Sequence, residues 1–284
     1  MNQFICVIAT LAVTLVSLPN SFAGSTAKVI DQTIPRMVKI FGAGGVKGLH
    51  AYGTGFIVSK EGHIATVWNH VLDSDEVTVI DGDGRRWSAK VIGGEPQLDL
   101  AVLKVIDGPS DFPYFDLEKA RTGSAGTRVL AFSNMFKVAT GSEPVSVIHG
   151  VIEAKTKLSA RKGTYEIPYQ GDVYIVDAIT NNPGSGGGVL TDYRGNLLGM
   201  IGRESRNTKT NTWVNYAVPV KNLKSTIDQI ISGKYISNEE NLVGDDNPNR
   251  YNSFDFGFIM MPDVLFRTPA YIGSIVAGSV AESK

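Results

Sequence analysis

The stretch NNPGSGGGVL at residues 181–190 places a serine among glycines, between two strand-like runs. Two earlier segments carry residues that could act with Ser185: ATVWNHVL contains His70, and QLDLAVL contains Asp99. A serine hydroxyl becomes a useful nucleophile when an imidazole accepts its proton and a carboxylate holds that imidazole in place. The order His70, Asp99, Ser185 is one of the orders in which such triads occur. The three segments therefore predict a nucleophilic site.

Short apolar runs separated by glycine-rich turns extend from about residue 38 to residue 217. Residues 81–84 (DGDG) are typical of a hairpin turn, because a calcium loop would need an acidic twelfth residue and position 92 is Ile. So many short strands predict an all-β fold of one or two closed barrels. Strands are predicted at 76–80, 86–92, 101–105, 128–132, 145–152, 173–179 and 197–201.

One helix is predicted, at residues 220–232, between Pro219 and Gly233. It has an apolar stripe suited to packing on a barrel. The polar segment 237–252 is interpreted as a linker. Strand-like sequence resumes within residues 253–284, which are too few for an independent core. We therefore expect a partial second domain after the linker.

Residues 1–23 have the pattern of a secretory signal, with an apolar run and small residues before Gly24. The alternative is an uncleaved membrane anchor, although the run is short for a span of about 20 residues. The only cysteine, Cys6, lies in this segment, so the mature chain would have no disulfide and no cysteine nucleophile. Export without cysteines suits a bacterial envelope, and we expect a periplasmic or secreted protein.

Charge and histidine spacing argue against a nucleic-acid-binding protein and against a metalloenzyme. The formal net charge is −1 with no long run of like charges, which predicts no nucleic-acid partner. No H-x-x-x-H or H-E-x-x-H spacing occurs, so neither a metal nor another cofactor is expected. His63 is expected in an exposed turn, and His149 in a structural strand.

Four segments, in this order, resemble the motifs of the HtrA type of trypsin-like serine proteases. The resemblance extends from about Gly53 to the end of the chain. The segments are GTGFIV at 53–58, TVWNHV at 66–71, LDLAVL at 98–103 and NYAVP at 215–219.

The resemblance implies two six-stranded antiparallel β-barrels with one C-terminal helix, within a protease domain at 24–236. His70 and Asp99 would lie on one barrel and Ser185 on the other. It also implies an exported serine endopeptidase that hydrolyses peptide bonds of unfolded or damaged envelope proteins. A homotrimer is suggested by the family alone.

The family's nucleophile motif, G-N-S-G-G, fits the loop in two registers. With Ser185 as nucleophile, Pro183 replaces the glycine whose N–H helps to form the oxyanion hole, and proline has no N–H. Losing such a donor costs roughly 100- to 1000-fold in rate. In the second register Gly184, which follows Pro183, is aligned with the first glycine of the motif. Gly186 then stands at the nucleophile position, which predicts a catalytically silent binding protein. We adopt the first register because it keeps a serine, with an oxyanion hole formed by Gly184, Ser185 and Gly186.

Two further expectations follow from resemblance. In trypsin-like folds the residue six before the serine, here Ile179, lies at the base of the first specificity pocket, which predicts apolar substrates. The segment Phe256, Gly257, Phe258 and Ile259 resembles the carboxylate-binding loop of PDZ domains, which predicts binding of peptide C-termini. A plain β-hairpin is the alternative for this segment.

Overall fold

The computed structural model describes residues 22–42, 51–72, 76–162, 165–167, 169, 171–235, 256, 258–261, 271–275 and 278–283. Within these residues no helix is long and apolar enough to span a bilayer. The predicted linker at 237–252 and most of the predicted signal lie outside the described residues.

Six antiparallel strands close the first barrel, in the order β1-β2-β3-β6-β5-β4. Side chains alternate between the two faces of each strand, and the inward ones, such as Ile40, Ile64 and Leu103, are fully buried. The strands are β1 (Met37–Phe41), β2 (Tyr52–Ile57), β3 (His63–Thr66), β4 (Val77–Ile80), β5 (Arg86–Glu95) and β6 (Leu100–Val105).

The β4–β5 hairpin turns at Asp81, as the sequence predicts. One carboxylate oxygen of Asp81 accepts hydrogen bonds from the backbone N of Asp83 (3.0 Å) and of Arg85 (2.9 Å). The other oxygen accepts from the indole N–H of Trp87 at 2.9 Å. Asp81 therefore satisfies turn donors, which explains the acidic pattern without a bound cation.

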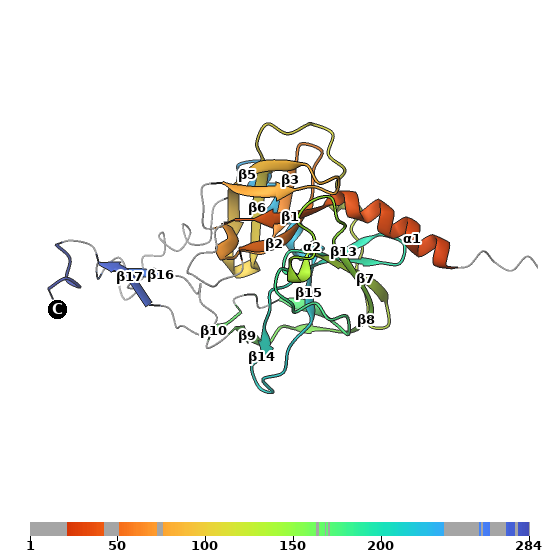
Figure 1. The fold of residues 1–284 in the computed structure, drawn as a ribbon. Coiled ribbons are helices and arrows are strands. Elements are labelled where there is room, and N and C mark those ends of the chain that lie inside the picture. The colour runs from red at the N-terminus through yellow and green to blue at the C-terminus, as the bar shows by residue number, and fades with distance from the viewer. Residues whose placement is uncertain are drawn as a thin grey trace, which may run out of the picture.

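A second closed barrel follows, in the order β11-β15-β13-β12-β7-β8. Its strands are β7 (Arg128–Ser133), β8 (Ser146–Lys157), β11 (Asp172–Val176), β12 (Val189–Asp192), β13 (Leu197–Ile201) and β15 (Tyr216–Pro219). A small sheet lies beside it, made of β9 (Ala160–Lys162), β10 (Tyr165–Glu166) and β14 (Arg206–Asn207). Figure 1 shows the first barrel in orange and yellow next to the second in green and cyan. The prediction of two six-stranded antiparallel barrels is confirmed.

The predicted closing helix is α2 (Val220–Ile231), and Gly233 follows it with φ 67°. Its apolar stripe packs inward, and Ile230 contacts β5 so closely that a Cβ at Gly93 would lie 2.7 Å from its Cγ2. After the helix, the Tyr235 hydroxyl donates a hydrogen bond to the carboxylate of Glu95. The helix and its last residues thus join the second barrel to the first.

A second helix, α1 (Phe22–Thr33), was not predicted, and it begins before the expected cleavage point at Gly24. It projects from the barrels in Figure 1 and buries Val29 and Thr33. The short 3₁₀ helices are η1 (Ile34–Arg36), η2 (His70–Leu72), η3 (Pro96–Leu98), η4 (Leu117–Lys119) and η5 (Met135–Lys137).

Near the C-terminus, β16 (Phe258–Met261) and β17 (Tyr271–Ile275) form a two-stranded antiparallel sheet. The pairing shifts register between Ile259 and Met260. This sheet agrees with the strand-like sequence there. A PDZ-like peptide groove stays a prediction, because Gly257 and residues 262–270 lie outside the described part.

Candidate active site

The three segments that carry the predicted triad meet where the barrels adjoin. After β3 ends, the backbone N of Trp68 donates to the carbonyl oxygen of Asp99 at 3.3 Å. From β2, the backbone N of Thr54 donates to the carbonyl oxygen of Gly186 at 3.4 Å. His70 opens η2 two residues after Trp68, and its backbone alone is described. The fold therefore gathers the expected histidine, aspartate and serine segments.

Asp99 lies in a tightly held turn. Pro96 starts η3, and the carboxylate of Glu95 caps it by accepting from the backbone N of Gln97 at 2.9 Å. Asp99 then takes a left-handed conformation with φ 53°, which Asp tolerates better than most residues. Its side chain is only 2% exposed. The sequence thus buries a carboxylate at a fixed position between β5 and β6.

Arg203, two residues after β13, binds this carboxylate. Its Nε donates to Oδ2 of Asp99 at 2.8 Å, and its Nη2 donates to Oδ1. The same Nη2 donates to the carbonyl oxygen of Trp68. Two parallel N–H···O bonds to one carboxylate form the strong bidentate geometry of Arg–Asp pairs. Sequence reasoning missed Arg203, because the partners are 104 residues apart and nothing local marks the arginine.

Tyr216 completes the surroundings of this ion pair. A Cβ at Gly202 would lie 2.1 Å from the Tyr216 ring, so only glycine allows the ring to occupy this place. Burial raises the pKa of the Tyr216 hydroxyl, and the charge of Asp99 raises it further. Tyr216 is therefore a neutral group beside Asp99 and Arg203 at any physiological pH.

Ser185 is fully buried in the glycine-rich loop. Its hydroxyl accepts a long hydrogen bond, 3.4 Å, from the hydroxyl of Ser133. Its backbone N–H donates to the carbonyl oxygen of Asn182 at 3.0 Å. In this arrangement neither the hydroxyl expected to attack nor the N–H expected in the oxyanion hole is presented to a substrate.

Only one glycine of the loop that follows Ser185 has room for a side chain pointing toward Arg203. Gly187 has φ 84°, and a Cβ there would lie 2.1 Å from the carbonyl oxygen of Thr54. At Gly186 the nearest atom to a Cβ is Cγ2 of Val67 at 3.0 Å, and the Cα of Arg203 lies at 3.6 Å. A side chain at position 186 would therefore face the residues around Asp99.

The first part of the loop is fixed through its carbonyl groups. The Thr54 hydroxyl donates to the carbonyl oxygen of Gly184 at 2.6 Å. The backbone N of Phe136 donates to the carbonyl oxygen of Pro183 at 2.8 Å. Gly184 has φ 83°, as this tight turn requires. The predicted oxyanion residues Gly184, Ser185 and Gly186 thus lie in one rigid turn.

The expected pocket residue Ile179 is 60% exposed. Its neighbour Thr180 is 3% exposed, and its hydroxyl has no hydrogen-bond partner among the described residues. The side-chain oxygen of Asn215 accepts from the backbone N of Thr180 (2.9 Å) and of Asn181 (3.2 Å). The buried side chain of this segment is therefore the threonine.

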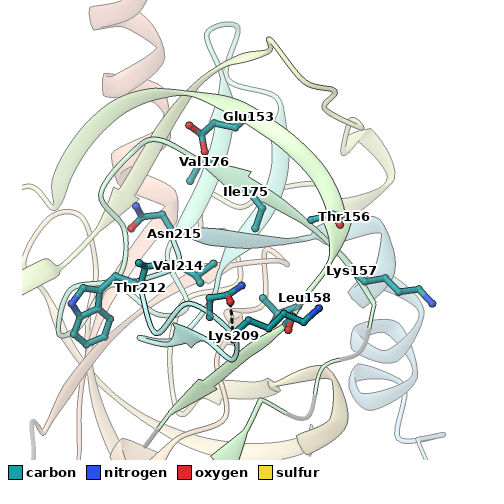
Figure 2. A pocket seen from close by; sticks show the side chains of 13 residues that line it. Glu153, Thr156, Lys157, Leu158, Ile175, Val176, Lys209, Thr212, Val214 and Asn215 are labelled. Carbon is teal, nitrogen blue, oxygen red and sulfur yellow. Dashed lines mark hydrogen bonds between the residues drawn. The ribbon is translucent and has the colours of Figure 1, made fainter.

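A separate pocket of about 480 Å³ opens on the second barrel (Figure 2). Trp213 lies on its rim, 46% exposed, with the Arg206 guanidinium 4.2 Å from the centre of its ring. The pocket includes none of His70, Asp99 and Ser185. Its lining comes from β8, the two residues after β8, β11 and the segment 207–215: Glu153, Thr156, Lys157, Leu158, Ser159, Ile175, Val176, Asn207, Lys209, Thr212, Trp213, Val214 and Asn215.

Among the described residues, no cluster of three or more His, Cys, Asp or Glu side chains could hold a metal ion. In the predicted peptide-binding segment, Phe256 is 43% exposed, and its carbonyl oxygen accepts from the backbone N of Ala281 at 3.0 Å. Phe258 and Ile259 open β16.

Comparison with known proteins agrees with this fold. Residues 53–200 match the trypsin-like peptidase domain family. A DegP-like periplasmic serine endoprotease of Chlamydia trachomatis is 30% identical over 180 residues, which are 63% of this chain and 34% of that protein. One from Pseudomonas fulva is 32% identical over 206 residues, which are 72% of this chain and 40% of that protein.

A solved structure of the HtrA-type protease AlgW with a tripeptide is also similar. It has a TM-score of 0.56 and 29% sequence identity, and the match covers 74% of this chain and 65% of that one. The chain spans well under half the length of the curated relatives described above.

Proposed function

Because this chain belongs to the HtrA type of trypsin-like serine proteases, a class of hydrolases, we propose that it is a weak endopeptidase for unfolded or damaged polypeptides of the bacterial envelope. The observation that carries the proposal is the 3.3 Å hydrogen bond from Trp68 N to Asp99 O. It joins the histidine segment to the aspartate turn where the barrels meet. The periplasmic names of the relatives support an exported protein.

In the proposed reaction, the Ser185 hydroxyl attacks the peptide carbonyl carbon while His70 accepts its proton. The proton passes to the departing amine, and water then hydrolyses the acyl-enzyme. Asp99 would stabilise the imidazolium of His70. The rate would be low because Ser185 must first leave its buried position and because Pro183 offers no N–H to the oxyanion.

A second candidate function is binding without cleavage, and the position of Gly186 favours it. A side chain at residue 186 would face Arg203, whereas the hydroxyl of Ser185 is buried beside Ser133. In this case the cleft would still hold an extended polypeptide, but no nucleophile would reach it.

Labelling with a fluorophosphonate probe separates the two candidates. Label on the wild type that is lost in Ser185→Ala supports the endopeptidase. Label that appears only in Gly186→Ser supports the binding protein and places the nucleophile position at 186. A matched His70→Ala version of each labelled protein should lose the label, since both mechanisms need the same base.

The substrate preference, the binding of peptide C-termini and the oligomeric state are proposed from the family resemblance and from the sequence segments named above. Substrates would be proteins or peptides with apolar residues at the site near Ile179. Residues 253–284 would bind peptide C-termini if they belong to a PDZ-like domain. The homotrimer would be visible in light scattering as a mass three times that of a single mature chain.

A further inference from the structure

Arg203 binds Asp99, the residue that would hold the His70 imidazole in the proposed mechanism. Each carboxylate oxygen of Asp99 accepts a hydrogen bond from the Arg203 guanidinium. We infer that Arg203 is a positioning residue that fixes the Asp99 carboxylate and cancels its charge, so that His70 is a weaker base than in a triad with a free aspartate. This inference rests on the proposed function, because it concerns the same site.

Burial makes the pairing effective. The Asp99 side chain is 2% exposed and the Arg203 side chain 18% exposed, so water screens the pair poorly. A carboxylate with a guanidinium in bidentate contact acts on a neighbouring imidazole almost as a neutral dipole. In the proposed triad, where Asp99 holds the His70 imidazole, a full negative charge without the arginine would favour the imidazolium and raise the pKa of the histidine.

The surrounding structure holds Arg203 in this place. Its Nη2 also donates to the carbonyl oxygen of Trp68, so the guanidinium bridges the Asp99 turn and the segment that leads to His70. The glycine at position 202 lets the Tyr216 ring lie beside it. The charge of Asp99 also reaches the buried Tyr216 hydroxyl and raises its pKa, so Tyr216 stays neutral beside the ion pair.

The test is an NMR titration of the His70 imidazole in the full chain, with His70→Gln used to assign its signals. The wild-type titration gives the reference pKa of the His70 imidazole. In Arg203→Met, which keeps an unbranched apolar stem and removes the charge, the pKa of His70 should rise by about one to three pH units. Arg203→Lys restores a positive charge and should return the value toward the wild type.

An unchanged pKa of His70 in a folded Arg203→Met protein would overturn the inference and leave Arg203 a purely structural residue. If Arg203→Met does not fold, Asp99→Asn combined with Arg203→Met removes both charges together. The double variant should show the wild-type pKa of His70, because a neutral pair replaces a neutral pair. A lower value would show that Asp99 acts on His70 undiminished in the wild type, and would refute the inference.

The labelling result distinguishes this inference from the proposed function. If the pKa of His70 rises in Arg203→Met and fluorophosphonate labelling rises with it, both stand. If the pKa rises and no labelling occurs, Arg203 controls Asp99 as inferred, but the loop supplies no nucleophile and the endopeptidase proposal fails.

Discussion

The hydroxyl of Thr54 donates a 2.6 Å hydrogen bond to the carbonyl oxygen of Gly184. Thr54 belongs to β2 of the first barrel, and Gly184 to the loop that precedes β12 of the second. The same hydroxyl oxygen accepts from the backbone N of Asn134 at 2.8 Å. One buried hydroxyl therefore ties two loops of the second barrel to the first barrel.

Thr54→Val should destabilise the protein, because the nearly isosteric valine leaves Gly184 O and Asn134 N without this partner. Each buried group left unpaired costs about 1–3 kcal/mol. Urea denaturation followed by fluorescence measures the free energy of unfolding. Thr122→Val, at an exposed threonine, is the control and should change it by less than about 0.5 kcal/mol. Equal effects of the two substitutions would contradict the role of Thr54.

Alanine at Gly186 should be tolerated, whereas alanine at Gly187 should not. At Gly187 the Cβ would clash with Thr54 O in a left-handed backbone, which costs more than about 1 kcal/mol. At Gly186 only Cγ2 of Val67 must move slightly. Thermal unfolding of both variants checks this, and a Gly186→Ala protein as unstable as Gly187→Ala would show that position 186 cannot carry a side chain.

Stability should fall as the pH drops through about 6.5, in part because of His63. His63 opens β3 instead of lying in an exposed turn, and burial lowers its pKa, followed by the charge of Lys104 on the neighbouring strand. The unfolded chain then binds the proton more readily, so the folded state loses stability as pH falls through the unfolded value. His63→Gln should flatten this part of the stability–pH curve.

The matched control for that experiment is His149→Gln, which removes an exposed histidine from β8. A steeper curve for His63→Gln than for His149→Gln would contradict a depressed pKa at His63.

Cleavage, where it occurs, should follow small or medium apolar residues. The segment 178–190 contains no Asp or Glu that could neutralise a lysine or arginine side chain in a pocket, and Ile179 presents an apolar surface there. Mass spectrometry of a digested peptide library reads the preference directly. Preferential cleavage after Lys or Arg would show that a carboxylate from another segment serves the pocket.

The fold was predictable because its signals are local. The turn at Asp81 and the strands around it alternate apolar and polar residues, and α2 has a helical stripe between Pro219 and Gly233. The helix α1 was not predicted, because the signal-like pattern ends within it and few of its described side chains are buried. Its packing on the barrels is a tertiary effect that no local pattern shows.

The site was predictable only in part. The order of His70, Asp99 and Ser185 located the three segments, and the structure brings those segments together. The sequence could not show that Ser185 is buried or that Arg203 binds Asp99, since both depend on contacts between distant residues. The sequence allows two registers for the loop. The space at Gly186 supports the second register, in which position 186 is the nucleophile position.

The hydrogen bond between Tyr235 and Glu95 fixes the segment after α2 to the first barrel. Glu95 caps η3 through Gln97, just before Asp99, and it also accepts from the hydroxyl of Tyr235, the last residue of the described stretch 171–235. The described stretch that contains α2 is therefore fastened, at its last residue, to the turn that carries the buried carboxylate. Glu95 thus makes one carboxylate common to the cap of the Asp99 turn and to the end of the α2 segment.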